Sequence, residues 1–205
     1  MLEIKCFEFG LFGTNTYVVR DGERVFLIDP ACSSAYEEQQ LFRYFSDLWS
    51  QIPHFQLTIL ATHGHLDHLW GAKWATDQWH TSVYMHEADI PMAKAMQQQY
   101  DLFGIERVAE AFPVQSFAKL QDANHPFELI YTPGHTPGSV CFYWPKEKVL
   151  FSGDTLFCMG YGRTDLPGGN YRQLVESLQY LFSLPADTQV YPGHGEYTTI
   201  GQEAR

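Results

Sequence analysis

Three histidines and an aspartate fall within six consecutive positions, directly after a short apolar segment. Residues 57–61 read Leu-Thr-Ile-Leu-Ala, which is typical of a buried strand, and the four ionisable side chains that follow are His63, His65, Asp67 and His68. Burying four such groups without partners costs several kcal/mol, so a fold that contains this stretch must hold them with something. A metal centre is the simplest answer, and it constrains the fold more than any other feature of the chain.

The spacing inside this stretch indicates how metal ions are bound. In an extended chain, His63 and His65 point to the same side and can bind one ion together. Leu66 and Asp67 are expected to turn the chain, so that Asp67 and His68 reach a second ion. This arrangement needs no helix through its ligands, unlike the His-Glu-x-x-His pattern.

The same design recurs three times further along the chain. Each time an apolar strand ends, a turn that contains glycine follows, and a side chain able to bind metal sits on or beside that turn. These side chains are His135 after residues 127–131, Asp154 after residues 149–151, and His194 after residues 189–191. If the strand ends lie along one edge of the fold, the four loops converge on one metal centre. The remaining histidines, which have no such setting, are expected to be ordinary surface or core residues: His54, His80, His86 and His125.

The rest of the chain combines short strands with helices and has no linker, repeat or low-complexity tract, so one domain is expected over residues 1–205. Strands are expected at residues 2–7, 16–20, 25–28, 57–61, 83–85, 127–131, 140–144, 149–151 and 189–191. A capping box at Ser34–Glu37 predicts a helix, and Asn170 is expected to cap another over residues 171–182. Further helices are expected at about 70–79 and 88–100. Residues 101–124 are expected to form a helical insertion or a lid.

Composition narrows the range of partners. The net charge of −11 makes nucleic acid and anionic membranes poor partners. The first ten residues do not resemble a signal peptide, and no stretch reaches the roughly 18 apolar residues of a membrane helix, so a cytoplasmic location is expected, as a monomer or homodimer. The four cysteines are scattered and are expected to be free thiols: Cys6, Cys32, Cys141 and Cys158.

The ordered set of metal-binding residues resembles that of the metallo-β-lactamase-fold superfamily. Within that superfamily, the chain is similar to the short glyoxalase II-like, or hydroxyacylglutathione hydrolase-like, hydrolases. The segments that carry the likeness are residues 13–17, 63–68, 132–139, 152–157, 162–165 and 192–195. The resemblance implies an α/β fold with four αββα layers and an active site at one edge.

The resemblance also implies a role for each ligand. One metal ion would be held by His63, His65 and His135, and a second by Asp67, His68 and His194, with Asp154 bridging the two. The implied cofactor is two Zn²⁺ ions per chain, with Fe or Mn as alternatives. The implied reaction is attack on a thioester by a hydroxide that bridges the ions, for which Asp67 and Asp154 are the catalytic carboxylates. The positive metal centre favours an anionic small-molecule substrate. Arg163 is expected either to form a local ion pair with Asp165 that braces the loop or to contact the substrate anion.

Two points leave the substrate open. True glyoxalase II enzymes carry a helical C-terminal domain that holds glutathione, whereas only residues 195–205 follow His194 here, so no separate glutathione-binding domain is expected. The segment Gly162-Arg163-Thr164-Asp165 is also similar to one in persulfide dioxygenases, which share the fold but use one iron ion. A mononuclear iron persulfide dioxygenase and a lactone hydrolase with the same metals are therefore the alternative functions.

Overall fold

The computed structural model describes residues 2–120 and 125–204, which form two compact units. The first unit contains residues 2–61, 65–84 and 92–115. The second contains residues 62–64, 85–91, 116–120 and 125–204. Both units are discontinuous in sequence, and the chain passes between them within the 61–65 stretch. The expectation of one domain over residues 1–205 stays a prediction, and its ends and residues 121–124 lie outside the described part.

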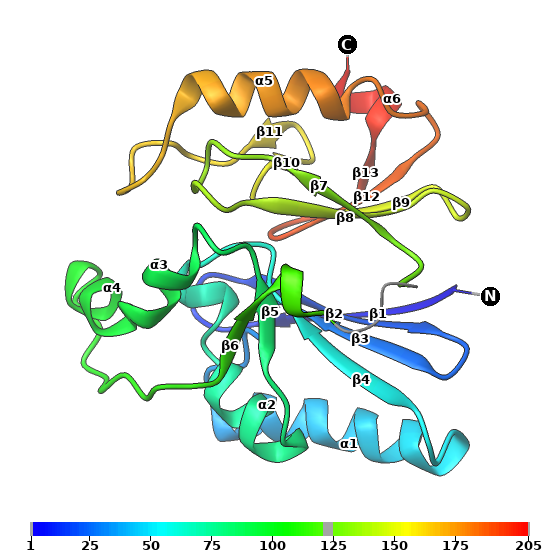
Figure 1. The fold of residues 1–205 in the computed structure, drawn as a ribbon, viewed down its shortest axis with the longest axis vertical. Helices are drawn as coiled ribbons and strands as arrows, with labels where there is room; N and C mark the ends of the chain where they lie inside the picture. Colours follow the sequence, from blue (N-terminus) through cyan, green and yellow to red (C-terminus); the bar gives the residue numbers. More distant parts are fainter. Residues whose placement is uncertain (1, 121–124, 205) are drawn as a thin grey trace. The chain divides into compact units, whose positions relative to one another are not determined.

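The first unit is built on a six-stranded sheet (Figure 1). Its strands, in the order in which they neighbour one another, are β1 (Leu2–Phe9), β2 (Thr14–Asp21), β3 (Arg24–Ile28), β4 (Gln56–Leu60), β5 (Val83–Met85) and β6 (Val114–Ser116). The pairs β1–β2 and β2–β3 are antiparallel, whereas β3–β4 and β4–β5 are parallel. The helical elements are α1 (Ala35–Gln51), η1 (Leu66–His68), α2 (Ala72–Trp79) and α4 (Met96–Leu102), and helix α3 (Ile90–Lys94) begins in the second unit and ends in the first. Helices α1 and α2 lie on the same face of the sheet (Figure 1).

Helix α1 begins where the capping box predicts. The Ser34 hydroxyl accepts a hydrogen bond from the Glu37 amide, and the Glu37 carboxylate accepts from the amides of Ser33 and Ser34. The same carboxylate also accepts from the Gly10 amide at 2.9 Å, which ties the turn between β1 and β2 to the start of the helix. The buried side chains of α1 are Leu41, Phe45 and Leu48.

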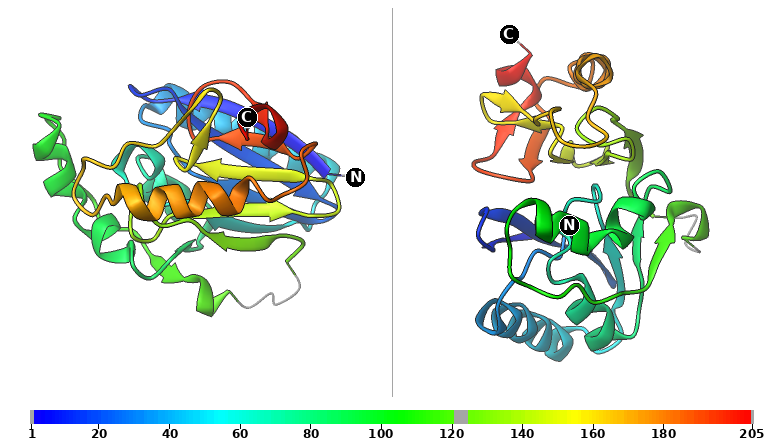
Figure 2. Two further views of the ribbon diagram at one scale, coloured as in Figure 1. Left: turned by 90° about the horizontal axis from the view of Figure 1, so that it is seen from above. Right: turned by 90° about the vertical axis from the view of Figure 1, so that its left-hand side faces the viewer.

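The second unit is built on a five-stranded sheet whose neighbours run in the order β13-β12-β9-β8-β7. These strands are β7 (Glu128–Tyr131), β8 (Val140–Trp144), β9 (Val149–Gly153), β12 (Gln189–Pro192) and β13 (Thr198–Thr199). A separate hairpin consists of β10 (Leu156–Phe157) and β11 (Gly160–Tyr161), and the helical elements are η2 (Phe117–Lys119), α5 (Tyr171–Leu181) and α6 (Ile200–Glu203). Within this unit, α5 runs along strands β8 and β9 (Figure 2).

Helix α5 packs against this sheet. Asn170 caps it by accepting from the Gln173 amide at 3.2 Å, as the sequence predicts. Its apolar side chains share one buried cluster with side chains of the sheet strands β7, β8, β9 and β12; the cluster includes Leu174, Leu178, Leu181, Ile130, Cys141, Leu150 and Val190. This packing fixes the sheet edge to which the loops after β7, β9 and β12 are attached.

The structure corrects the expectation for residues 88–124. The helix expected over residues 88–100 is interrupted at Ala95, which separates α3 from α4. The helical insertion expected over residues 101–124 is wrong for its described part, since α4 ends at Leu102 and strand β6 and the single turn η2 follow. Gly104, at φ +65°, turns the chain after α4, and Pro113 precedes a strand-forming segment that pairs at the sheet edge. Residues 121–124 lie outside the described residues.

The short elements β10, β11, β13 and α6 were not expected either, because two to four residues carry too little periodicity to be recognised. Within the described part of the chain, no helix combines the length and the apolar character needed to span a lipid bilayer.

Candidate metal centre

Sheet topology brings three of the predicted ligand loops of the second unit to one edge. Strands β9 and β12 are parallel neighbours, and β7 runs in the same direction because two antiparallel pairings, through β8, separate it from β9. The carboxyl ends of all three strands therefore meet at the same edge. His135 follows β7, Asp154 follows β9 and His194 follows β12. The Gly193 amide also donates to the Gly153 carbonyl at 2.8 Å, which links two of these loops.

The ligand candidates of the second unit lie within reach of one another. The Asp154 Oδ2 atom lies 3.4 Å from His135 Nε2 and 3.5 Å from His194 Nε2. A ligand atom of His63 lies within 4.8 Å of one on His135 and of one on Asp154. The side chains of His63 and His135 are buried, whereas the His194 side chain is 26% exposed. The second unit thus gathers four of the seven predicted ligands.

The first unit contains the other three predicted ligands. The Asp67 Oδ2 atom lies 3.5 Å from His68 Nε2, and both residues belong to the one-turn 3₁₀ helix η1. The expectation that no helix passes through the ligands is therefore wrong for this pair, because Asp67 and His68 project from that turn. His65 lies directly before η1 with an extended backbone, and it is buried. The Leu66 amide donates to Gln99 Oε1 at 2.9 Å, so α4 braces the turn.

Hydrogen bonds at Nδ1 orient three of the histidines. The Nδ1 atom of His68 donates to Asp29 Oδ2 at 2.8 Å, and that of His135 donates to the Arg163 carbonyl at 2.7 Å. For His63, the Thr62 hydroxyl lies 3.0 Å from Nδ1. A partner at Nδ1 makes Nε2 the metal-binding nitrogen and fixes the plane of the ring, which is how proteins usually prepare an imidazole ligand.

The orienting residues Asp29 and Thr14 were missed by the sequence analysis. Asp29 is 1% exposed and has a positive φ of 52°, which is uncommon for a residue other than glycine and often marks a functional position. The Thr16 hydroxyl donates a hydrogen bond to the backbone carbonyl of Asp29 at 2.6 Å. Thr14 donates to Asp67 Oδ2 at 2.9 Å. The available signal was an aspartate at the end of a strand, in Ile28-Asp29-Pro30, but no spacing rule linked it to His68.

Two glycines allow close packing around Asp154. A Cβ atom on Gly162 would lie 1.8 Å from the Asp154 carbonyl oxygen, which no side chain can tolerate. Gly153, at φ +50°, would place a Cβ atom 2.6 Å from the Thr62 side chain. These glycines are needed because the backbone of the Asp154 loop has neighbours at contact distance on both sides.

The structure gives Arg163 two roles, of which the sequence predicted only the local ion pair with Asp165. Its carbonyl orients His135, whereas its guanidinium forms a two-pronged ion pair with Asp165, with both N–O distances at 2.6 Å. The hydrogen bonds from Arg163 lower the pKa of the Asp165 carboxyl to about 2. Both side chains are exposed. Contact of Arg163 with a substrate stays a prediction.

The cysteines are free thiols, as expected, and two of them, Cys32 and Cys141, are buried. Burial raises the pKa of both thiols, to about 11 for Cys141, so neither provides a thiolate at neutral pH. Cys158 lies between β10 and β11 and is partly buried.

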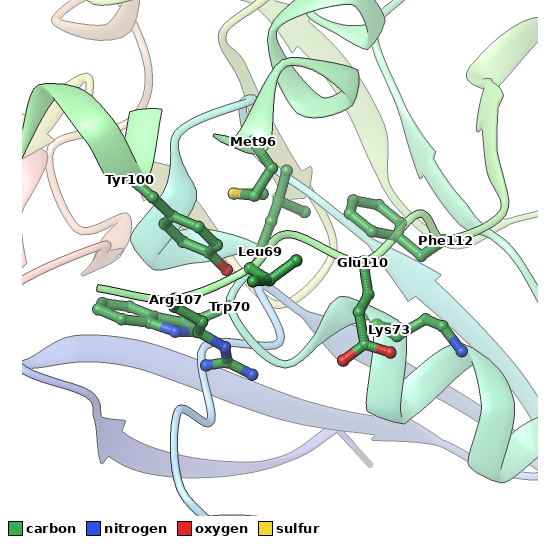
Figure 3. A pocket seen from close by; sticks show the side chains of 9 residues that line it. Leu69, Trp70, Lys73, Met96, Tyr100, Arg107, Glu110 and Phe112 are labelled. Atoms are coloured by element: carbon green, nitrogen blue, oxygen red, sulfur yellow. The ribbon is translucent and has the colours of Figure 1, made fainter. Parts of the chain in front are cut away.

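The aromatic side chains of the 100–117 segment do not share one role. Tyr100 and Phe112 line a pocket of the first unit next to η1, together with Leu69, Trp70, Lys73, Met96, Arg107, Val108 and Glu110 (Figure 3). The cavity measures about 20 Å³, which is room for roughly one water molecule and not for a substrate. Phe103 instead contacts Phe12, and Phe117 packs against Phe142 within the second unit.

The donor set of the two units fits divalent metal ions. It consists of five imidazoles and two carboxylates without a thiolate, which suits Zn²⁺, Fe²⁺ and Mn²⁺ and does not suit Ca²⁺ or a soft metal ion. The histidines whose Nδ1 partner is described present Nε2, and the carboxylate oxygens of Asp67 and Asp154 each lie within 3.5 Å of an imidazole nitrogen of their own unit. The residues present in each unit therefore fit metal binding.

Comparison with known proteins identifies the family of the chain. Residues 9–194 match the model of the metallo-beta-lactamase superfamily. Hydroxyacylglutathione hydrolase GloC of Haemophilus influenzae is 34% identical over 203 residues, which cover 95% of this chain and 91% of that protein.

Solved structures show the same fold. The crystal structure of TTHA1623 in a di-iron-bound form has a TM-score of 0.83 and 34% identity, and the match covers 98% of this chain and 97% of the other. The crystal structure of ETHE1 from Myxococcus xanthus has a TM-score of 0.69 and 26% identity, and covers 99% and 82%. The fold class and the resemblance inferred from the sequence are confirmed: this chain has a mixed α/β fold and belongs to the metallo-β-lactamase superfamily.

Proposed function

We propose that this chain is a binuclear metallohydrolase. In this scheme His63, His65 and His135 would hold one divalent ion, Asp67, His68 and His194 would hold a second, and Asp154 would serve both. The observation that carries the proposal is the position of Asp154, whose Oδ2 atom lies within 3.5 Å of an imidazole nitrogen of His135 and of one of His194. These two histidines belong to different ions in the scheme, so one carboxylate stands beside both ligand sets.

The side chains of the protein then act by holding and orienting. Bound divalent ions lower the pKa of water from about 15.7 toward about 7 and polarise a carbonyl oxygen. Asp67, held by the Thr14 hydroxyl, is placed to pass a proton to a leaving group. No protein nucleophile is required, which agrees with the buried Cys32 and Cys141 thiols and their raised pKa values.

The substrate we propose is a thioester of a small hydroxyacyl group. The support is the 34% identity to a hydroxyacylglutathione hydrolase over almost the full length of both chains. A thioester suits a site of this kind because its carbonyl accepts attack readily and its thiolate leaves without strong acid assistance. Zinc is the proposed metal, with iron and manganese as the alternatives, of which the di-iron relative supports iron.

The test begins with the metal content of the purified protein and its hydrolysis of S-lactoylglutathione, simple acyl thioesters and lactones. The proposal expects close to two ions per chain, thioester cleavage that a chelator abolishes, and recovery when Zn²⁺ is added back. Lactone cleavage without thioester cleavage would keep the metal scheme and replace the substrate. Full thioesterase activity in metal-free protein would overturn the proposal.

An iron-dependent persulfide dioxygenase is the second candidate. It is favoured by the likeness of the Gly162–Asp165 stretch noted in the sequence and by the structural likeness to ETHE1, at a TM-score of 0.69. A mononuclear iron site would need only two histidines and one aspartate, which leaves His194 beside Asp154 without a ligand role. Oxygen uptake with glutathione persulfide, in protein that holds one iron ion, would establish this candidate over the hydrolase.

A further inference from the structure

Asp89 is a fully buried carboxylate of the second unit that belongs to neither proposed ligand set. It is 0% exposed and lies in the turn before α3. Its Oδ2 atom accepts from the Gly64 amide at 2.8 Å and from the Thr136 hydroxyl at 2.6 Å, and its Oδ1 atom accepts from the Gly138 amide at 2.7 Å. Three donors offset the large cost of burying the charge.

These three donors come from the two loops that carry His63 and His135. Gly64 directly follows His63, and Thr136 directly follows His135. The rings of the two histidines lie 4.8 Å apart, edge to face. A single carboxylate therefore connects the backbones of two ligand loops that are more than seventy positions apart in the sequence.

The packing shows that the connection is specific to a carboxylate. A Cβ atom on Gly138 would lie 2.7 Å from Asp89 Oδ1, so only glycine lets the amide come this close. In the structure, the Gly64 and Gly138 amides donate to different oxygens of the Asp89 carboxylate. An asparagine at position 89 would have only one acceptor oxygen, so it could accept from only one of these two amides. Whichever way the asparagine amide is turned, its NH₂ group faces the N–H of Gly64 or Gly138.

We propose that Asp89 is a positioning residue: it sets the spacing of the His63 and His135 loops and thereby the affinity for the metal ion these histidines share. This inference rests on the proposed function, because it takes His63 and His135 as ligands of one ion. The role of Asp89 is exerted through the loop backbones and requires no contact with metal or substrate.

The experiment compares Asp89→Asn with Leu181→Ala, a matched control that weakens the core of the second unit and is not bonded to either loop. Hydrogen–deuterium exchange of the metal-free proteins is followed in peptides that contain Gly64 and Gly138. We expect Asp89→Asn to speed exchange by about tenfold or more in these two peptides, while Leu181→Ala speeds it across the α5 region. Competition with a chromophoric chelator measures the affinity for the first metal ion. We expect this affinity to be 10- to 100-fold lower in Asp89→Asn, about the cost of losing a partner that orients ligands, and equal to that of the wild type in Leu181→Ala.

Thr136→Val keeps the inference testable if Asp89→Asn does not fold. It removes only the hydroxyl donor and leaves both backbone bonds, so exchange and metal affinity should change in the same direction but by less. Wild-type metal affinity in Asp89→Asn, or equal losses in Asp89→Asn and Leu181→Ala, would overturn the inference. A wild-type protein that binds two ions but cleaves no thioester would overturn the proposed substrate and leave the role of Asp89 intact. A wild-type protein that binds no metal would overturn both.

Discussion

The two units present their ligand candidates in different ways. In the first unit, His65, Asp67 and His68 come from one stretch of four residues around a single 3₁₀ turn, and side-chain partners such as Asp29 and Thr14 orient them. In the second unit the candidates come from four segments between residues 63 and 194, and the register of a sheet brings three of them, His135, Asp154 and His194, to one edge. Side-chain hydrogen bonds thus secure the local group, whereas strand ends, close-packed glycines, the Arg163 carbonyl and the buried Asp89 carboxylate secure the dispersed one.

This difference indicates how mutations are expected to affect each group of ligands. The local group keeps its ligands near one another even when the surrounding fold loosens, because the chain itself connects them. The dispersed group depends on every strand end being in register. The largest effects of mutation are therefore expected in the second unit.

Replacement of Asp154 by alanine tests the dispersed group most severely. The change removes the oxygen that lies beside both His135 and His194, so we expect metal affinity and hydrolysis to fall together by more than about 100-fold, since loss of a mere orienting partner already costs 10–100-fold. Metal analysis and thioester assays measure this. Asp165→Asn is the control, because this nearby carboxylate is exposed and paired with Arg163. Retained turnover in Asp154→Ala would contradict the bridging role.

Gly162→Ala tests the packing of the same loop. The added Cβ atom would overlap the Asp154 carbonyl oxygen at 1.8 Å, so the loop must shift at a cost of about 1–3 kcal/mol or more in folding free energy. Metal affinity should fall with stability. Gly160→Ala is a matched control on the same segment, because a Cβ atom there meets nothing within 4 Å. Thermal unfolding with and without metal compares the two; equal behaviour would show that the loop adapts.

Asp29→Asn tests the local group. Asparagine tolerates the positive φ at this position, so the change acts on the hydrogen bond to His68 and not on the backbone. We expect a 10- to 100-fold loss of metal affinity, the usual cost of losing a carboxylate that orients a histidine ligand. Asp47→Asn on the exposed side of α1 serves as the control. Unchanged affinity would mean that the 3₁₀ turn alone positions His68.

Arg163→Gln is expected to have the smallest effect on the fold. Without the guanidinium, the pKa of Asp165 should rise from about 2 toward its ordinary value of about 3.9. Because the pKa is lowered in the folded protein, the pair stabilises fully above the unfolded-state pKa and loses its effect as the pH falls through about 2. NMR titration of the Asp165 carboxyl carbon measures the change. A rise in the KM of Arg163→Gln at neutral pH, with constant kcat, would support the separate prediction that Arg163 contacts an anionic substrate.

Much of the fold was predictable because its signals are local. The capping box at Ser34 and the cap at Asn170 predicted the starts of α1 and α5, and the strand β5 was predicted with its observed bounds. The segment after Tyr100 was not, because its strand β6 is three residues long and takes its partner from the edge of a sheet. Edge pairing is a tertiary interaction that leaves little pattern in so short a segment.

The candidate ligands could be named in advance because imidazoles and carboxylates on glycine-rich turns after apolar strands are chemically costly to place anywhere else. Their partners could not. Asp29, Asp89, Thr14 and the Arg163 carbonyl are ordinary in sequence and become significant only through distances of 2.6–2.9 Å to residues far along the chain.

The sequence by itself determined the donor chemistry and the order of the ligand loops, since these depend on residue types and on short periodicities, and its resemblance to a known superfamily indicated the class of fold. Only the tertiary structure decided which atoms orient those donors: the 3₁₀ turn under Asp67 and His68, the carbonyl behind His135, and the buried carboxylate that joins the His63 and His135 loops. Hydrogen bonds require positions accurate to a few tenths of an ångström, and a chain reaches that accuracy only after its strands have been packed into register.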